Sequence, residues 1–361
     1  MTTSFAAELA GAIEACSADG AFVVESAIAG TSSPARLAEM FVAVVQRALL
    51  SDPCELLFYR VGSGIVAGFV LGDGRSVVAK AHQRFHSDAS LRSQRAVQAK
   101  ARIAGIGAPE AIAGPIGFGR GLLTIDSFEE PGTSCADLPP GVGPGVRRLL
   151  AEALFSIGLL GTDRGAEAAD GARTDDESLT RLSVCAPGSL YPSPHSPLFD
   201  FTATSAGAEW IDEIAADVLR VLRGLGPLPR VVTHADLRAE NVRMRPDGRS
   251  LAVIWDWDSV ESASEAWHVG TTARAHSLDF SLGGGQGTDI GLPTVKDMLG
   301  FISDYESTRG VAFTEAERLA VQASAQHALA YSARCEHALE STYGPVRWRP
   351  GFRDRLREFS V

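Results

Sequence analysis

The sequence predicts an α+β protein of two lobes, in which a small β-rich lobe precedes a larger, mainly helical lobe. Between residues 56 and 82, short runs rich in β-forming residues alternate with Gly-containing turn signals. From about residue 144 onward, apolar residues recur instead at helical spacing. Pro131-Gly132 and the polar stretch after it mark the boundary between these two regions. With 361 residues, the chain is long enough for two hydrophobic cores.

Residues 1–50 are expected to form a helical extension that precedes the small lobe. Two helices are predicted, over residues 6–15 and 35–50, with a linker rich in Gly, Ser and Thr between them. Apolar positions at helical spacing support the second helix: Leu37, Met40, Phe41, Val44 and Val45. The extension carries no catalytic pattern, so we expect it to pack against the residues that follow it.

Residues 51–131 are expected to form the small lobe with its hinge. The predicted elements are strands over residues 56–61, 65–71, 76–82 and 122–128 and a helix over about residues 87–104. Asp73-Gly74 is a hairpin turn signal between the second and third strands. The sequence therefore predicts a hairpin-rich sheet with one helix.

Residues 132–361 are expected to form the helical lobe. Helices are predicted over residues 147–160 and 210–222, where apolar residues follow a helical period. Thr314 and Glu317 have the spacing of a capping box, which predicts the start of a long C-terminal helix.

Two stretches of this lobe are predicted to be loops. Residues 162–178 are polar and lack a regular apolar period. Residues 283–287 read GGGQG, but no strand leads into them and no Lys follows them. A flexible loop is therefore favoured there over a phosphate-binding loop.

Composition excludes several classes of function. The net charge of −11 disfavours a nucleic-acid partner, because an acidic protein repels phosphate backbones. The chain has no run of about 18 apolar residues and no basic start followed by an apolar stretch, so neither a membrane helix nor a secretory signal is expected. Five scattered cysteines without a C-x-x-C pair argue against a disulfide scaffold or a zinc site. A cytoplasmic protein is expected, and its oligomeric state is not indicated.

A cluster of polar residues lies in the stretch VVTHADLRAENVRMRPDGRSLAVIWDWD, residues 231–258. Its Pro-Asp-Gly turn predicts a hairpin that brings Asn241 close to Asp256. An amide oxygen and a carboxylate suit Mg²⁺, which prefers oxygen ligands. Asp236 lies nearby and can accept or orient the proton of a hydroxyl group. Such a set suits phosphoryl transfer, where positioning and charge neutralisation provide most of the catalysis.

Simpler explanations exist for each residue taken alone. A lone His before a strand, such as His234, is more often a buried residue with satisfied hydrogen bonds. Asp236 and Asn241 are also common turn residues. Arg238 can be a solvated charge, and Asp258 fits either the surface or the site. The combination with Asp256 on a hairpin favours the catalytic interpretation.

The residues H-A-D-L-R-A-E-N and V-I-W-D-W-D have the spacing of a kinase catalytic and metal-binding signature. In this form they resemble the aminoglycoside phosphotransferase family, which also includes choline- and homoserine-kinase-like enzymes. The resemblance extends over roughly residues 55–340. It implies a protein-kinase-like bilobal fold and a kinase that uses Mg²⁺ with ATP or GTP, between which the sequence does not distinguish.

The resemblance implies roles for individual residues of the large lobe. Asp236 would be the catalytic base, and Asn241 and Asp256 would be the magnesium ligands. His234 would brace the loop through hydrogen bonds. Many relatives have His where this chain has Arg238, and an Arg there could reach the γ-phosphate.

Two further carboxylates are looser matches. Asp279 resembles an acid that supports the catalytic loop from the following helix. Asp258 would either support the metal site indirectly or face the substrate.

The resemblance also assigns nucleotide-binding residues to the small lobe. Lys80, in the third predicted strand, would hold the α- and β-phosphates. The turn Gly62-Ser63-Gly64 could cover phosphates with its amides, although a simple hairpin turn explains it equally well. The base would meet backbone groups of Asp126, Ser127 and Phe128. The family usually pairs its Lys with a Glu, but this chain offers Gln94, or alternatively Gln98, at that place.

The expected acceptor is a hydroxyl group of a small molecule. An acidic excess over residues 161–215 favours a cationic acceptor, such as an aminoglycoside, amino sugar or amino alcohol, although a solvated acidic face explains it equally well. Four tryptophans could form an aromatic wall for such a molecule, but core packing is the better default: Trp210, Trp255, Trp257 and Trp267.

Two rival functions remain open from the sequence. A nucleotide-binding pseudokinase that acts through a partner is motivated by the missing Glu, and the intact set of Asp236, Asn241 and Asp256 argues against it. A metallohydrolase that uses His234 and Asp236 as ligands lacks a second His at ligand spacing, and it would leave Lys80 without a role.

Overall fold

The computed structural model divides into two compact units. The described residues are 5–16, 22–130, 132–135, 143–160, 185–186, 188–226, 228–280, 290–344 and 351–359. The first unit comprises those within Met1–Ala99, Pro109–Glu130 and His195–Phe199, and the second comprises those within Lys100–Ala108, Pro131–Pro194 and Asp200–Val361. The two predicted loops, over 162–178 and 283–287, and Pro131 of the predicted boundary lie outside the described residues.

The first unit is built on a five-stranded antiparallel sheet in the order β1-β2-β3-β5-β4. Its strands are β1 (Pro53–Val61), β2 (Ile65–Leu71), β3 (Ser76–His82), β4 (Ala111–Phe118) and β5 (Gly121–Ser127). The strands predicted over 56–61, 65–71, 76–82 and 122–128 are thereby confirmed. Alternate residues of β3 point to the same face of the sheet, and Val77, Ala79 and Ala81 are fully buried. The face on which these three residues lie is therefore the apolar one.

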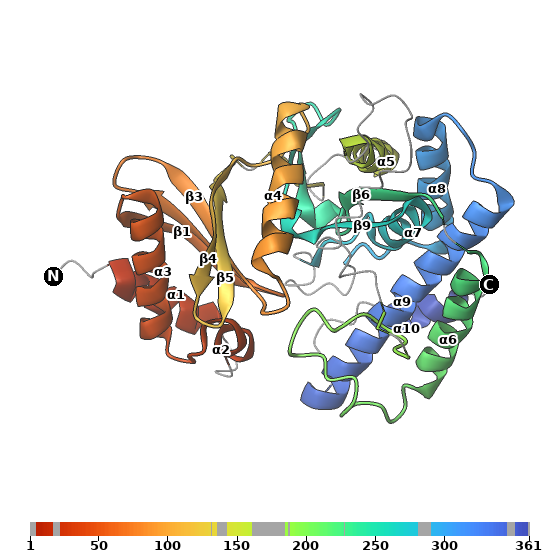
Figure 1. Ribbon diagram of the computed structural model, residues 1–361, viewed down its shortest axis with the longest axis horizontal. Helices are drawn as coiled ribbons and strands as arrows, with labels where there is room; N and C mark the ends of the chain where they lie inside the picture. Colours follow the sequence, from red (N-terminus) through yellow and green to blue (C-terminus); the bar gives the residue numbers. More distant parts are fainter. Residues whose placement is uncertain are drawn as a thin grey trace. The chain divides into compact units, whose positions relative to one another are not determined.

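Three helices cover the apolar face of this sheet (Figure 1): α1 (Phe5–Cys16), α2 (Val23–Ala29) and α3 (Pro34–Leu49). Phe41 of α3 lies at the centre of the core, with ring centroids 6.2 Å from Phe69 and 4.7 Å from Phe118. Two helices were predicted here, and the structure adds α2. With seven residues, α2 is too short to show a helical period in the sequence.

Helix α4 (Asp88–Ile103) lies on the other side of the sheet from α3 (Figure 1). Its inward-facing residues include Leu91 and, one and two turns later, the buried amides Gln94 and Gln98. This inner face is partly polar, so the second face of the sheet is not an ordinary hydrophobic core. Buried amides require hydrogen-bond partners, which ties this face to a specific arrangement of polar groups.

The second unit is mainly helical, as predicted. Its helices are α5 (Gly143–Leu160), α6 (Glu209–Gly224), α7 (Glu265–Ala275), α8 (Val295–Arg309), α9 (Glu315–Tyr343) and α10 (Phe352–Glu358). Helix α9 packs against α6, α7 and α10, and α5 packs against α8. The predicted capping box at the start of α9 is confirmed, since the Thr314 hydroxyl accepts the Glu317 N–H and the Glu317 carboxylate accepts the Thr314 N–H.

Two small antiparallel sheets carry the polar stretch of the second unit. Strand β6 (Arg230–His234) pairs with β9 (Val260–Ser264), and β7 (Val242–Met244) pairs with β8 (Leu251–Ile254). The β7–β8 hairpin was predicted, whereas β9 was not. Its sequence VESAS is half polar and therefore carries little β-signal.

Helices α7 and α9 approach closely at a glycine. A Cβ atom on Gly270 would lie 2.4 Å from the Val321 carbonyl oxygen and 2.8 Å from the Ala325 nitrogen, both in the backbone of α9. Real Cβ atoms do not approach backbone this closely, so the two helices would have to separate to admit a larger side chain.

We expect Gly270→Ala to lower the free energy of unfolding by about 1–3 kcal/mol, because it overpacks a rigid helix contact. Denaturant unfolding of the purified variant measures this. Gly158→Ala in α5 is the matched control, since the atom nearest to its Cβ is the Val231 Cβ at 4.0 Å. It should be neutral or stabilise by up to about 1 kcal/mol through helix propensity. Equal losses in both variants would contradict the close-packing explanation.

Candidate active site

The loop that follows β6 is anchored by backbone hydrogen bonds to the end of α7. The N–H of Ala239 donates to the His276 carbonyl at 3.0 Å, and the N–H of Glu240 donates to the Leu278 carbonyl at 3.1 Å. The loop then closes with a single 3₁₀ turn over Ala239–Asn241 before β7 begins. Residues that are far apart in the sequence therefore fix its course.

His234 joins the two polar motifs of this unit. Its imidazole is completely buried, and its Nε2 lies 2.7 Å from the Trp255 carbonyl oxygen. Because a carbonyl can only accept, Nε2 carries the proton, and Nδ1 accepts the Asp236 N–H at 3.3 Å. Burial lowers the pKa of His234, so the ring remains neutral. A neutral ring with both nitrogens engaged suits a bracing role.

Asp236 is held by the amide of Asn241. The Asn241 Nδ2 donates to both the Oδ2 and the backbone carbonyl of Asp236, each at 2.9 Å. Both acceptors are oxygens, so the NH₂ group must face Asp236 and the Oδ1 of Asn241 must point elsewhere. That oxygen makes no hydrogen bond within the described residues, and it remains free to act as a ligand.

Arg238 lies on the other side of Asp236. Its guanidinium is 3.3 Å from Asp236 Oδ1 and 3.0 Å from Glu240 Oε2, and it stacks over the Phe280 ring at 5.1 Å. Although burial disfavours its charge, Asp236 and Glu240 raise the pKa of Arg238. Burial also raises the pKa of Glu240. Glu240 was not singled out in the sequence, where it appears as an ordinary charged residue beside Asn241.

Asp256 lies next to this loop through the β7–β8 hairpin. Val242 pairs with Ile254, and the Trp255 N–H donates to the Asn241 carbonyl at 2.8 Å. Asp256 has φ 63° and ψ 40°, a left-handed conformation that is uncommon outside glycine and that Asp tolerates better than most residues. Strained backbone of this kind is frequent at functional sites. The hairpin thus brings Asn241 and Asp256 together, as the sequence predicted.

The tryptophans near this loop serve packing. Trp257 is buried, donates its indole N–H to the Ile254 carbonyl at 2.7 Å, and presents an edge to the His234 ring at 5.5 Å. Trp255 is half-buried beneath the Arg243 guanidinium at 4.7 Å. Asp258, which follows Trp257, is half-buried.

In the first unit, Lys80 lies on the polar face of the sheet. It pairs with Thr124, and Val78 pairs with Asp126 two residues away on the same face. The alternate residues of β3 are buried in the core beneath α1–α3. Lys80 and Asp126 therefore share the face on which α4 lies.

Asp126 receives the polar side chains of α4. Arg95 donates to the Asp126 carboxylate at 2.8 Å and to the Ile125 carbonyl at 3.1 Å, and the Gln98 amide reaches the same carboxylate at 3.3 Å. Burial raises the pKa of Asp126, and the Arg95 charge opposes this. Gln94, expected beside Lys80, lies on the buried inner face of α4. Arg95 was not foreseen, because an arginine on a helix is ordinarily a surface residue.

The other predicted nucleotide contacts are partly engaged within the unit. The N–H of Ser127 donates to the Glu110 carbonyl at 2.9 Å, and the N–H of Phe128 donates to the Ser76 carbonyl at 3.0 Å. A base at this segment must therefore use other backbone groups. The turn Gly62-Ser63-Gly64 is the β1–β2 hairpin turn, and a Cβ on Gly64 would lie 2.8 Å from the Ala81 carbonyl oxygen. Close approach to β3 explains this glycine.

Comparison with known proteins identifies the family. The model of the phosphotransferase enzyme family matches residues 66–277, which is more than half of the chain. The chain belongs to this family. It is a small-molecule kinase, and the resemblance seen in its motifs is confirmed. A comparison with curated proteins returns no match.

Solved structures with the same fold include three kinases. An amicoumacin kinase in complex with AMP-PNP and Ca²⁺ has a TM-score of 0.58 at 12% identity, covering 88% of this phosphotransferase and 91% of that chain. An ethanolamine kinase from Plasmodium vivax has a TM-score of 0.53 at 11% identity, with coverages of 94% and 92%. A choline kinase from Streptococcus pneumoniae has a TM-score of 0.52 at 12% identity, with coverages of 90% and 97%. At these identities the likeness shows the fold, which confirms the predicted α+β kinase-like class.

None of the helices in the described parts of this phosphotransferase combines the length and apolar character that crossing a lipid bilayer requires.

Two buried histidines lie in helix α7 and at its C-terminal cap, next to the loop that follows β6. Burial lowers the pKa of His268 to about 3 and that of His276 to about 4. The folded protein therefore keeps both rings neutral at mildly acidic pH, while the unfolded chain protonates them near the ordinary pKa of about 6.5. Stability that is present at pH 7 is lost as the pH falls through 6.5 toward the folded pKa.

We expect His268→Leu to lack the part of this acid-induced loss of unfolding free energy that comes from His268. Between pH 7 and pH 5, His268 costs the wild type about 2 kcal/mol of unfolding free energy, which the leucine variant does not lose. Denaturant unfolding of both proteins at the two pH values measures the change. A difference between the two proteins that stays constant with pH would contradict a buried neutral His268.

Proposed function

We propose that this kinase transfers the γ-phosphate of ATP or GTP to a hydroxyl group of a small molecule, with Asp236 as the base. The contact that carries the proposal is the Asn241 amide on the Asp236 carboxylate, at 2.9 Å. It fixes one carboxylate oxygen and leaves Asn241 Oδ1 directed away from it. A base and a potential metal ligand are therefore oriented by the same amide group.

Asp236 accepts the proton of the attacking hydroxyl or orients that hydroxyl for attack. Its carboxylate is already bound by Asn241 at Oδ2 and by Arg238 at Oδ1, so its orientation is set before the acceptor arrives. His234 adds a third restraint through the Asp236 N–H. Pre-set orientation lowers the cost of reaching a reactive geometry.

Asn241 Oδ1 and the Asp256 carboxylate are the residues that would hold Mg²⁺. Both are hard oxygen donors, which is the chemistry that this ion selects, and the β7–β8 pairing brings their backbones together. A bound divalent cation neutralises charge on the phosphates during transfer. The solved complex of the amicoumacin kinase with AMP-PNP and Ca²⁺ supports a nucleotide and a divalent cation in this fold.

Arg238 supplies positive charge for the transferred phosphoryl group. Its guanidinium is protonated because Asp236 and Glu240 raise its pKa, and Glu240 keeps it in place when Asp236 is engaged with a hydroxyl. Arg243, by contrast, bonds the carbonyls of Glu240 and Val242 and so stabilises the loop itself.

Residues 51–131 form the nucleotide-binding lobe in this proposal, and residues 132–361 carry the acceptor, with residues 1–50 as an extension. Lys80 holds the phosphates, and Gln94 provides a neutral hydrogen-bonding group beside it. The turn Gly62-Ser63-Gly64 covers the nucleotide, and the segment Asp126, Ser127 and Phe128 meets its base. Arg95 and Gln98 keep that segment in place through Asp126.

The proposed acceptor is an alcohol such as an aminoglycoside, an amino sugar or an amino alcohol. The ethanolamine and choline kinases of the same fold support an amino alcohol. Much of the acidic stretch that motivated a cationic acceptor, residues 161–184, lies outside the described residues.

We expect Asp236→Asn to lower phosphoryl transfer by about 10²- to 10⁴-fold, because the amide cannot accept the proton. AMP-PNP affinity should be nearly unchanged, since the substitution is isosteric. Transfer of labelled γ-phosphate to an acceptor panel, beside AMP-PNP titration, measures both. Asp247→Asn, in an exposed turn, is the control and should keep full activity. Near-normal turnover by Asp236→Asn would remove Asp236 from its role.

We expect Lys80→Ala to weaken AMP-PNP binding about tenfold or more, because a charge-assisted contact to phosphate is lost. Titration calorimetry in the presence of Mg²⁺ measures the affinity. Lys296→Ala, on the exposed side of α8, removes the same charge elsewhere and should leave the affinity unchanged. If both variants bind AMP-PNP like the wild type, the small-lobe assignment is wrong.

A further inference from the structure

Arg274, on α7, is a half-buried arginine without a carboxylate partner among the described residues. Its Nη1 donates to the Ser332 hydroxyl of α9 at 2.7 Å, and its Nε is buried without any hydrogen bond. Across the described residues, no carboxylate lies within ion-pair distance of this guanidinium. A hydroxyl satisfies one donor but does not neutralise a charge.

Two other arginines of the same unit do have carboxylate partners. Arg334, which is almost completely buried, has the Asp212 carboxylate at 3.5 Å, and Arg238 has both Asp236 and Glu240. Burial lowers the pKa of Arg274 to about 10, which still leaves it protonated at neutral pH. A half-buried cation without a counter-ion still loses part of its hydration, and a bound anion would restore that loss.

Arg274 lies beside the catalytic loop. It precedes His276 by two residues, and the His276 carbonyl accepts the Ala239 N–H of the loop. Arg274 interacts electrostatically with Asp236 and Arg238, at distances longer than that of an ion pair. An anion bound to Arg274 would therefore lie close to the proposed base without using the groups that hold that base.

Tyr331 interacts electrostatically with Arg274 and belongs to a pair of aromatic rings. Tyr331, next to Ser332 on α9, packs against the Phe201 ring at 5.8 Å, and both rings are half-buried. The Arg334 guanidinium stacks over Phe201 at 4.9 Å and also bonds its carbonyl oxygen. Arg334 thus holds the Phe201 ring in place.

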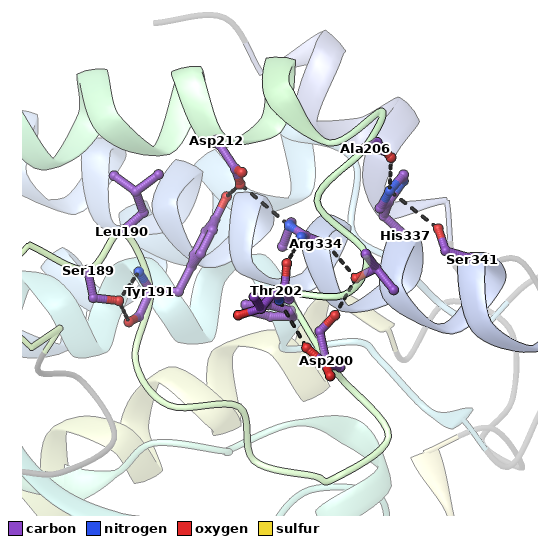
Figure 2. Close-up of polar contacts among 12 residues, drawn as sticks. Ser189, Leu190, Tyr191, Asp200, Thr202, Ala206, Asp212, Arg334, His337 and Ser341 are labelled. Carbon is purple, nitrogen blue, oxygen red and sulfur yellow. Dashed lines mark hydrogen bonds and ion pairs between the residues drawn. The ribbon is translucent and has the colours of Figure 1, made fainter.

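The Asp212 carboxylate is already engaged by other side chains. Figure 2 shows Asp212 accepting the Tyr191 hydroxyl, at 2.9 Å, and facing the Arg334 guanidinium. The same arginine bonds the Thr204 hydroxyl, at 3.2 Å, so that the segment around Phe201 is fastened to α6 and α9. Asp212 is therefore committed to the fold rather than available to an ammonium group.

We propose that Arg274 binds a carboxylate of the acceptor, and that Tyr331 and Phe201 flank the apolar part of the same molecule. This inference rests on the proposed function and narrows it, because it makes the acceptor a hydroxy acid, with or without an amine. The planar guanidinium matches a carboxylate, which would take the donors of Arg274 that face away from the Ser332 hydroxyl and the buried Nε.

The test compares acceptors that differ in a single group: 4-(hydroxymethyl)benzoate, its amide and 4-(aminomethyl)benzyl alcohol, with glucuronate, glucose and glucosamine as a second set. Titration calorimetry with saturating Mg²⁺ and AMP-PNP gives each affinity. The wild type should bind the acids about ten- to a hundredfold more tightly than the matched neutral compounds. Arg274→Met should abolish this preference, and Arg274→Lys should keep part of it.

Arg230→Met is the control, because Arg230 is an exposed arginine of the same unit whose side-chain contacts are the carbonyl and hydroxyl of Ser262. It should keep the preference for acids. Thermal unfolding of each variant checks that it is folded. Acids that bind no better than their neutral partners, or not at all, would overturn the proposal, as would a preference that survives in Arg274→Met.

Two further outcomes separate this inference from others. If Arg274→Met lowers AMP-PNP affinity, the arginine serves the nucleotide phosphates and the acceptor assignment is wrong. If the wild type phosphorylates an amino alcohol or a neutral alcohol with no preference for acids, and Asp236→Asn abolishes that transfer, the proposed function stands while the role of Arg274 fails.

Discussion

The contact between the Asn241 amide and the Asp236 carboxylate is the interaction on which the account of the site depends. Because the amide donates to two oxygens of Asp236, its own oxygen is directed away and becomes available as a ligand. The Trp255 N–H, bonded to the Asn241 carbonyl, then brings Asp256 to the same place. The segment after α7 holds the loop from outside. The proposed base, the proposed ligands and the segment after α7 are therefore parts of one hydrogen-bonded unit.

Sequence patterns predicted the features that are encoded locally. The β-hairpin strands, the capping box of α9 and the β7–β8 hairpin each depend on residues within a few positions of one another. The motif around His234 was also recognisable, because its chemistry is concentrated in a short stretch. Helix α2 and strand β9 were missed, since each is short and takes its stability from what it packs against.

Features that depend on distant residues could not be predicted from the sequence. The role of Arg95 depends on Asp126, which lies on a different element. Glu240 becomes notable only when its contact with Arg238 is seen. Arg274 is the extreme case, because its interest comes from the lack of a carboxylate nearby among the described residues. No spacing in the sequence shows that a half-buried charge has no carboxylate partner, because burial and pairing are decided by packing.

The most direct measurement of the central claim is a double-mutant cycle on AMP-PNP affinity with Asn241→Ala, Asp256→Ala and the double variant, each with and without Mg²⁺. If both side chains hold one divalent cation, each single substitution should remove most of the Mg²⁺-dependent affinity, and the second should add little. Without Mg²⁺, the coupling between the two positions should disappear. Additive losses that are the same with and without Mg²⁺ would contradict a shared metal and the account built on it.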